Sequence, residues 1–465
     1  MISVSLKAET GLIEKVGKDE LLALASHAAL ECYQSESPKM GELIDVKGRL
    51  FDVSHHTTLE HHSFTFNVEG IAVSDITFGA HLCSPFYNSD QRSGRFCAEM
   101  FLNPDFESIK QYIKAFWPEL RNDQRAWMEI MNFIRNGVDV YHCHIKDATK
   151  LATELIAKER PHASAEYIQK NAQKIAQEQL RMFISAIFPT GFDFTVDFIT
   201  LVSLYRAAWT PGMLNLTKQM ASIVIERHPE IAYAFSRRED RGKEWAPLGD
   251  DFSCIHGCVE LEPRSTMFES DLGGCIIPDA NNMFPVDLLH FLPEYMDNNV
   301  GSIKTEVEIS VACMGQDQRH RTISRSSPSF TGNFYLPPVP ALLPGVLNLA
   351  RITLESWRWL TKLVPPTLSA TIAPYGAMVR YKKRGSLNAV LHEQAKRLCW
   401  CAQEEIYHLS RRFRQNIEHF HPDSSFLKAL EPLCSATGKC AEGKRYCGRE
   451  MSLHGSKHYF PKRKV

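Results

Sequence analysis

Two stretches of the chain alternate between apolar and polar residues with the two-residue period of a β-strand. The segment 63–68 (SFTFNV) places two phenylalanines and a valine on one face, and the segment 306–311 (EVEISV) places two valines and an isoleucine on one face. Each segment runs into a stretch rich in Arg, Ser, Asn and Gln. The pattern predicts a strand in each half of the chain and indicates related halves, although no exact repeat is visible.

Helical periodicity also occurs in both halves. Apolar residues at helical spacing predict helices over 198–208 and 391–409, and a long helical region from about 106 to 185 is broken near Pro161. The charged stretch 236–249 ends in Pro and Gly, which favours a linker with its boundary near Gly249. We therefore predict domains over 1–240 and 250–436, followed by a basic tail, 437–465, whose low apolar content predicts poor order.

Composition narrows the class of protein. A chain of 465 residues is long enough for two or three compact units, and 44% hydrophobic with 23% charged residues is typical of a globular protein. The formal net charge of −1 gives no global attraction to nucleic acid or to an anionic membrane. The N-terminus lacks a signal-peptide pattern, no apolar run is long enough to span a bilayer, and thirteen scattered cysteines are typical of reduced thiols. We predict a cytoplasmic protein without nucleic-acid or membrane partners.

A cluster of cationic donors follows the second predicted strand. Gln316 precedes Arg319-His320-Arg321, and several serines follow. Guanidinium forks match phosphate oxygens and keep their charge at any working pH. A surface loop paired with nearby acids is the alternative, but Gln316 and the serines can anchor a nucleotide without adding charge.

These residues carry a family resemblance. Arg319-His320-Arg321 followed after seven residues by Ser329 resembles the signature of the flavin-dependent thymidylate synthases (ThyX). Near the C-terminus, Arg397 precedes an Ala-Gln-x-Glu-Ile run at 402–406, which resembles the closing helix of that family. The resemblance implies that Arg397 lies against the uracil ring, where a cation raises electron density at C5. A purely structural arginine is the alternative.

The first half contains a histidine-rich segment before its strand. His55-His56-Thr57-Thr58-Leu59-Glu60-His61 resembles the flavin-contacting segment of the family, with Thr58 in place of proline. The resemblance implies that FAD contacts His55, Thr57, Glu60, Arg319, His320 and Arg321. The alternative is a metal site built from His55, His56, His61 and His62, but no cysteine or carboxylate completes a tetrahedral set. The fragments 142–144, 254–258 and 399–401 also lack ligands at metal spacing, so we predict no metal.

A second nucleotide segment lies further along the first half. Residues 90–96 (DQRSGRF) resemble the family's Asn-Glu-x-Ser-x-Arg-Tyr segment, and Ser93, Gly94 and Arg95 suit a phosphate cradle. The first half has lost the Arg-His-Arg signature, since it reads either 80–82 (AHL) or 83–85 (CSP) there. In the second half Thr331 replaces the phosphate-gripping arginine, and the family's Asn-x-Arg flavin contacts are not retained.

The losses in the two halves are complementary, which predicts one composite dUMP pocket. In the family, each nucleotide site lies between subunits, so a fused pair needs each set of residues once. The predicted dUMP-binding residues are Gln316, Arg319 and the catalytic Arg397 from the second half, facing Gln91, Arg92, Ser93, Gly94, Arg95 and Arg181 from the first.

The resemblance implies an α+β fold with two ThyX-like domains in tandem, each a β-sheet with long helices, and a homodimer of tandem chains. The implied reaction is reductive methylation of dUMP to dTMP, with methylenetetrahydrofolate as carbon donor and FAD, reduced by NADPH, as hydride source. One alternative is a related one-carbon transfer to a pyrimidine nucleotide, such as hydroxymethylation. The other is a non-catalytic descendant that binds nucleotide.

Overall fold

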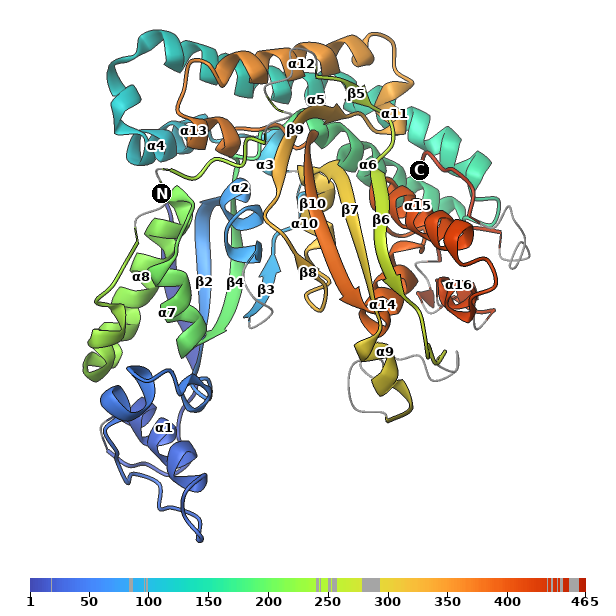
Figure 1. Ribbon diagram of the computed structural model, residues 1–465. Helices are drawn as coiled ribbons and strands as arrows, with labels where there is room; N and C mark the ends of the chain where they lie inside the picture. The colour runs from blue at the N-terminus through green and yellow to red at the C-terminus, as the bar shows by residue number, and fades with distance from the viewer. Residues whose placement is uncertain are drawn as a thin grey trace.

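The structure is a computed structural model of the chain, and it describes all residues except 18, 83–86, 96, 98, 240–241, 243, 250–251, 253–256, 278–292, 433, 436–437, 441, 444–445 and 451–459. Two mainly antiparallel sheets combine with long helices (Figure 1), which confirms the predicted α+β class. None of the helices in the described part is both long and apolar enough to cross a membrane.

The secondary structure elements follow the chain in two series. The first half contains β1 (Ser3–Glu9), α1 (Glu20–Glu31), β2 (Ser63–Ala72), α2 (Val73–Thr77), β3 (Tyr87–Gln91), α3 (Glu99–Leu102), α4 (Phe106–Phe116), α5 (Gln124–Glu159), α6 (Ala165–Leu180), β4 (Pro189–Asp197), α7 (Phe198–Arg206) and α8 (Pro211–Arg227). The second half contains β5 (Val259–Glu260), β6 (Arg264–Asp271), α9 (Met296–Val300), β7 (Ser302–Ser310), α10 (Val311–Asp317), β8 (Ser324–Arg325), β9 (Ser329–Tyr335), α11 (Pro338–Ala341), α12 (Val346–Leu360), α13 (Pro366–Thr371), β10 (Ala377–Ser386), α14 (Leu387–Arg397), α15 (Glu404–Phe420) and α16 (Ser425–Ala429).

Both predicted strands are confirmed. In β2 the alternating residues Phe64, Phe66 and Val68 are buried in the core. The second predicted strand forms part of β7, although Val311 begins α10 instead of continuing the strand. Glu308 of β7 is also buried. Asn333 and Arg380 bind its carboxylate at 2.9 and 3.1 Å, which offsets the cost of burying the charge.

The two sheets share one order of strand pairing. The first sheet has the order β1-β2-β4-β3, and the second contains β6-β7-β10-β9, with β5 and β8 added at β9 and β10. In both sheets a short helix follows the second strand (α2 and α10), and a side-chain-capped helix follows the last strand (α7 and α14). Thus Phe198 and Leu387, the first residues of α7 and α14, occupy corresponding places.

Hydrogen bonds at the junction of the two halves are also reciprocal. Ala186 N–H donates to the carbonyl of Ala373 at 2.8 Å, and Tyr375 N–H donates to the carbonyl of Ile184 at 2.8 Å. The amide of Ser74 in α2 binds Ala186, as the amide of Ala312 in α10 binds Tyr375. These bonds place α2 and α10 side by side and fix a correspondence in which residue 74 matches 312.

The helices between β3 and β4 in the first half and between β9 and β10 in the second half join the two sheets. The predicted break near Pro161 is confirmed, since α5 ends at Glu159 and α6 begins at Ala165. The predicted helix over 198–208 is also confirmed as α7. Helix α12 of the second half packs along α5 of the first, above both sheets (Figure 1). A single buried apolar cluster therefore extends through both halves.

The prediction of one continuous helix over 391–409 is wrong, because the structure has two helices there. Helix α14 ends at Arg397 and α15 begins only at Glu404. Between them, the carbonyl of Trp400 accepts a hydrogen bond from Arg160, and the side chain of Gln403 contacts Gln316. These contacts with distant residues replace local helical hydrogen bonds, which the apolar spacing cannot reveal.

Several described residues of the C-terminal tail pack against the rest of the chain, while poor order of the segment 437–465 as a whole stays a prediction. Arg463 is 3% exposed and donates to the carbonyl of Ala402 at 2.6 Å. Tyr407 donates to the carbonyl of Pro461 at 2.9 Å, and Val465 is buried. A few specific hydrogen bonds thus compensate for the low apolar content of this segment.

Candidate functional site

A pocket of about 370 Å³ lies where the two halves meet. It is lined by Val73, Thr77, Met100, Arg181 and the run Gln91–Arg95 from the first half, and by Val311, Ala312, Gly315, Gln316, Arg319, Tyr375 and Arg397 from the second. All the residues predicted from the sequence to bind dUMP, together with Arg397, line this one pocket. Their roles in binding stay predictions, but their proximity is a property of the fold.

One wall is the turn that leaves β3. Gly94 lies close to Arg181, since a Cβ atom at residue 94 would be 3.2 Å from its Nη1 atom, and the Gly94 carbonyl accepts a bond from Gln177 at 3.3 Å. The Ser93 hydroxyl accepts a hydrogen bond from the amide of Arg95 at 3.3 Å. The turn therefore presents a small hydroxyl and a backbone amide beside two guanidinium groups, which is a favourable arrangement for an anion.

The arginines of this wall have different surroundings. Arg95 forms a salt bridge through Nε with Glu178. Arg92 is bound to Glu69 at 2.7 Å near the surface. Arg181 is buried over the ring of Tyr375, 5.4 Å from its centroid, and its Nε atom has no hydrogen-bond partner. Burial lowers the pKa of Arg181, so its desolvated charge is available to stabilise an anion in the pocket.

The opposite wall comes from α10 and the end of α14. Arg397 Nη2 donates to the carbonyl of Gln316 at 2.6 Å, and its buried Nε atom has no hydrogen-bond partner. The side chain of Gln316 contacts Gln403, the residue just before α15. Arg397 is therefore fixed in place by α10 while part of its donor capacity is unused.

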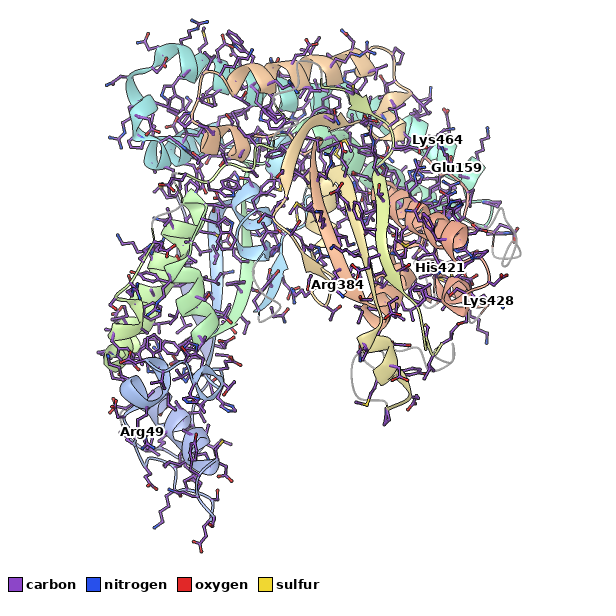
Figure 2. All side chains as sticks on the ribbon, in the orientation of Figure 1. Arg49, Glu159, Arg384, His421, Lys428 and Lys464 are labelled. Atoms are coloured by element: carbon purple, nitrogen blue, oxygen red, sulfur yellow. The ribbon has the colours of Figure 1, made fainter. Side chains whose placement is uncertain are left out.

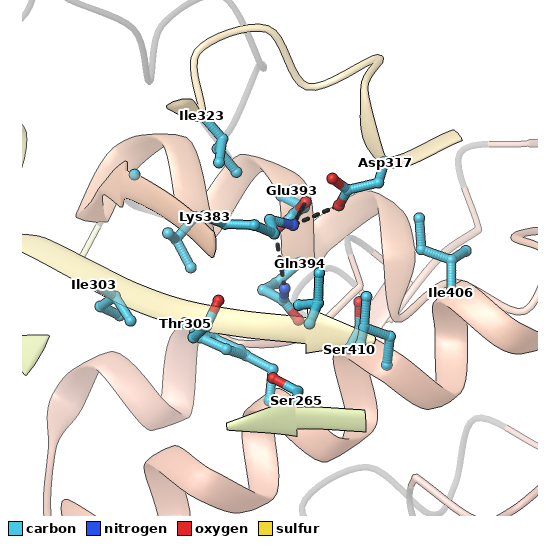
Figure 3. Close-up of a pocket in the computed structure, with 15 residues that line it drawn as sticks. Ser265, Ile303, Thr305, Asp317, Ile323, Lys383, Glu393, Gln394, Ile406 and Ser410 are labelled. Carbon is cyan, nitrogen blue, oxygen red and sulfur yellow. Dashed lines mark hydrogen bonds and ion pairs between the residues drawn. The ribbon is translucent and has the colours of Figure 1, made fainter. Parts of the chain in front are cut away.

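A buried ion cluster holds the loop that follows α10. Asp317 is fully buried, and its carboxylate binds Lys383 at 2.5 Å, Arg325 at 2.6 Å and the Tyr381 hydroxyl at 2.8 Å. Arg325 also donates to the carbonyls of His320 and Ile323, at 3.0 and 2.8 Å. Figure 3 shows Lys383 between Asp317 and Glu393, beside a small enclosed cavity of about 20 Å³. The cluster therefore sets the conformation of residues 317–325, which include the Arg-His-Arg signature.

The three signature residues face different surroundings. Arg319 lines the pocket, whereas Arg321 donates to Asn88 and to the carbonyl of Ser89 in the first half, at 2.7 and 3.0 Å. His320 is buried against the ring of His392, at 5.4 Å between centroids, and its Nε2 atom has no hydrogen-bond partner. Burial, with Arg397 nearby, holds the pKa of His320 well below its usual range, so its ring is neutral at physiological pH.

The lining of this pocket is strongly positive. Its described lining residues include five arginines (Arg92, Arg95, Arg181, Arg319 and Arg397) and no acidic side chain. Such a wall attracts an anion with several oxygens, and the forks of arginine match phosphate geometry. Tyr375, Val73, Val311 and Met100 add apolar surface for a planar ring.

Among the described residues, the corresponding position in the other half has aromatic and small side chains in place of the polar pocket residues. Under the correspondence fixed above, Phe78 occupies the place of Gln316, and Ala208 occupies the place of Arg397. Phe78 packs against Phe330 and Trp245, with ring centroids 5.3 and 5.7 Å away. Its carbonyl accepts a hydrogen bond from Trp209 at 2.6 Å, which mirrors the bond from Arg397 to Gln316. Aromatic packing thus fills the second position among the described residues.

The predicted flavin residues do not come together within one chain. His55, Thr57 and Glu60 lie around the short helix His56–Leu59, at the start of β2, whereas α2 and the pocket lie at its other end. The ten residues of β2 span about 33 Å at the usual rise per residue. In Figure 2 the labelled Arg49, in the short π-helix Lys47–Phe51 before this segment, is accordingly far from the second half. A site that uses both Arg319 and the segment 55–60 requires a second copy of the chain.

Several contributors were missed from the sequence. Tyr375 lines the pocket, and Asp317, Arg325 and Lys383 hold its loop, but none belongs to a local motif. Lys383 is a buried cation in the strand β10, but its burial becomes visible only in the structure. Of the predicted segments, Phe96 and residues 83–86 and 254–256 lie outside the described residues.

The family model that matches this chain covers its first half. Residues 12–230 match the family model of the thymidylate synthase complementing proteins (Thy1), a range that includes Gln91 to Arg95 and Arg181. No curated protein matches the chain. Similar solved structures include thymidylate synthase X from Helicobacter pylori with FAD and dUMP, at 17% identity over 51% of this chain and 98% of that protein, with a TM-score of 0.30. They also include the UMP/dUMP methylase PolB from Streptomyces cacaoi bound with 5-Br dUMP, at 14% identity over 51% and 95%, with a TM-score of 0.31.

Proposed function

We propose that this protein is a flavin-dependent thymidylate synthase that methylates dUMP reductively to dTMP. The observation that carries the proposal is the single pocket in which the run 91–95 and Arg181 of one half face Gln316, Arg319 and Arg397 of the other. The match of residues 12–230 to the thymidylate synthase complementing proteins supports it independently. Methylenetetrahydrofolate supplies the carbon in this proposal, and NADPH is the reductant.

The pocket residues have distinct roles in the proposed reaction. Ser93, the amide of Gly94 and Arg95 bind the phosphate, since they combine a hydroxyl, a free amide and a cation on one turn. Arg397 lies at the carbonyl edge of uracil, where its positive charge stabilises the polarised ring and increases the nucleophilicity of C5. Arg319 and Arg181 neutralise the remaining anionic charge, and the apolar wall excludes water from the ring.

FAD fits this chain only as a ligand shared between two copies. When bound, it accepts a hydride from the reductant and delivers one to the transferred carbon. His320, with its buried and unpartnered Nε2 atom, and Arg319 would hold it from one chain. His55, Thr57 and Glu60 would hold it from a second chain, because they lie at the far end of β2 within their own chain. We therefore propose a homodimer.

The two halves are, in this proposal, diverged copies of one domain. The shared strand order, the reciprocal hydrogen bonds between Ala186 and Ala373 and between Tyr375 and Ile184, and the matching positions of α2 and α10 support a duplication. Each copy keeps one wall of the ancestral pocket. The boundary near Gly249 and the predicted domains 1–240 and 250–436 are parts of the same proposal.

Tritium release provides the direct test. The purified chain is mixed with FAD, NADPH, methylenetetrahydrofolate and dUMP labelled with tritium at C5. We expect tritium release that depends on FAD, because C5 must lose its proton when it gains a methyl group, and we expect dTMP as the product. Release with a hydroxymethylated product would identify the related transferase instead. If neither release nor FAD binding occurs while dUMP still binds, the protein is a nucleotide-binding descendant.

Co-expression of two defective chains tests the shared flavin site. Chains carrying His55→Ala and chains carrying Arg319→Ala should each be inactive alone. A mixed dimer has one site with both defects and one intact site, so random pairing should restore about a quarter of the activity of the unmodified dimer. The control is co-expression of two differently tagged His55→Ala chains, which should recover nothing. Absence of recovery in the mixed sample would exclude a site shared in this way.

A further inference from the structure

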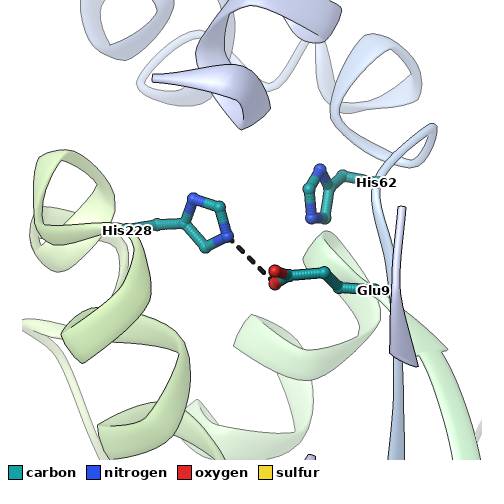
Figure 4. A group of neighbouring side chains, drawn as sticks. All are labelled: Glu9, His62 and His228. Atoms are coloured by element: carbon teal, nitrogen blue, oxygen red, sulfur yellow. Dashed lines mark hydrogen bonds and ion pairs between the residues drawn. The ribbon is translucent and has the colours of Figure 1, made fainter. Parts of the chain in front are cut away.

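A second group of polar side chains lies away from the pocket, at the opposite end of the first sheet. Glu9 ends β1, His62 precedes β2, and His228 follows α8. One ligand atom from each residue lies within 4.8 Å of the other two, and Figure 4 shows the three side chains pointing toward a common centre. Among the described residues, no other group of three such ligands is as close together.

His62 is the member of this group that is buried with an unsatisfied polar atom. It is 3% exposed, and its Nε2 atom has no hydrogen-bond partner. Burial, together with the neighbouring His228, lowers the pKa of His62 to about 4, so the ring is neutral at physiological pH. Leaving a buried polar atom without a partner destabilises the fold. Its ring packs on Phe64, 4.8 Å between centroids, but a phenylalanine would serve that purpose without the cost.

The other two residues are already arranged as metal ligands. Glu9 Oε2 lies 3.2 Å from His228 Nε2, close to the separation of about 3.3 Å between neighbouring ligand atoms of a tetrahedral zinc site. Arg227 donates to both oxygens of Glu9, at 2.9 and 3.0 Å, and lowers the pKa of the carboxyl. An ionised carboxylate has about four acceptor positions, so Oε2 retains a lone pair for a cation.

A fourth side chain stands behind His228. Glu230 Oε1 lies 3.5 Å from His228 Nδ1 and is itself buried without a hydrogen-bond partner. When a histidine binds metal through Nε2, the proton resides on Nδ1, and a carboxylate behind the ring accepts it. A cation at the centre of the group would bind His62 Nε2 directly. It would also fix the proton of His228 on Nδ1, where Glu230 Oε1 accepts it.

We propose that Glu9, His62 and His228 form a binding site for a divalent transition-metal ion of the Zn²⁺ class. Two imidazoles and one carboxylate suit Zn²⁺ and its neighbours, whereas Mg²⁺ prefers oxygen ligands. An open groove of about 670 Å³, whose lining includes Glu9 and His228 but not His62, gives water access to the side of the site formed by these two residues. The ion links β1, β2 and the end of α8, and it lies next to the segment 55–60.

Metal binding by the full chain tests this site directly. The protein is stripped with chelator and titrated with Zn²⁺ by calorimetry, with Mg²⁺ as a competitor and metal content measured after dialysis. We expect one Zn²⁺ per chain and no competition by Mg²⁺. His62→Phe, which keeps the ring packing, and Glu9→Gln should each weaken binding by more than about 100-fold. Glu230→Gln should weaken it by about 10- to 100-fold, because it removes only the acceptor behind His228.

His61→Phe is the matched control, since His61 is the exposed neighbour of His62 and should leave Zn²⁺ binding unchanged. A thermal melt separates binding from folding defects, because Zn²⁺ should raise the melting temperature of the unmodified chain and of His61→Phe but not of His62→Phe. If His62→Phe binds Zn²⁺ as tightly as the unmodified chain, the metal is an adventitious ion only. If the unmodified chain binds no Zn²⁺, the proposal is wrong.

Discussion

Arg397→Ala should lower tritium release from C5-labelled dUMP by about 100- to 1,000-fold, the loss typical of removing one preorganised donor. The side chain is fixed by its bond to the carbonyl of Gln316 and has an unpartnered Nε atom, so its charge is oriented before the substrate arrives. Arg397→Lys should recover little, because an ammonium lacks the planar fork of the guanidinium.

Two comparisons show whether the effect belongs to the reaction. Lys396→Ala alters the exposed neighbour on the same helix and should leave the rate unchanged. Arg95→Ala should mainly raise the KM for dUMP, since we assign Arg95 to the phosphate, whereas Arg397→Ala should mainly lower kcat. If dUMP binding and tritium release survive both alanine variants, the composite pocket is not the active site.

Asp317→Ala should reduce the free energy of unfolding by about 3–5 kcal/mol, the usual cost of removing one member of a buried ion cluster. Lys383 and Arg325 would remain buried without their common carboxylate. Denaturant unfolding of the purified variant measures the loss. Asp317→Ala combined with Lys383→Met should be more stable than Asp317→Ala alone, because it removes one uncompensated charge. Equal stability of Asp317→Ala and the unmodified chain would show that the cluster does not stabilise the fold.

The pH dependence of this effect has a defined sign. Burial alone would raise the pKa of Asp317, but the adjacent Arg325 and Lys383 hold it well below its usual range. A carboxyl whose pKa is lower in the folded state stabilises the fold above its unfolded pKa of about 3.9 and loses this contribution as the pH falls. The stability difference between the unmodified chain and Asp317→Ala should therefore be constant from neutral pH to about pH 5 and shrink below about pH 4.

Local patterns in the sequence predicted those features of the fold and of the pocket that are determined by residues close together in the chain. The alternation around Phe64 and Phe66 predicted β2, and the motif around Ser93 and Arg95 predicted one wall of the pocket. The complementary losses in the two halves placed Arg397 opposite that wall. The pairing of β2 with β4 and of β7 with β10 brings these motifs to one junction. The short motifs indicate that junction only when the motifs of both halves are compared.

Long-range contacts explain what could not be predicted. Asp317 and Lys383 are 66 residues apart, and nothing near either residue indicates the other. The break between α14 and α15 depends on the bond from Arg160 to Trp400, across 240 residues. The distance from His55 to the pocket depends on the length of β2 and on which end of it each motif occupies, whereas the resemblance alone placed both motifs at one flavin.

Phe78 and Ala208, at the position that corresponds to the pocket, affect how the two halves of the chain can diverge. In an assembly of identical subunits whose sites lie between subunits, every subunit must keep the residues of both walls. In the duplication that we propose, Phe78 and Ala208 occupy the places of Gln316 and Arg397, so these two pocket residues are needed in only one half. The chain therefore resembles a heterodimer in which the two different subunits are joined covalently. Under the function that we propose, one chain would bind one nucleotide, and its two halves would evolve under different constraints.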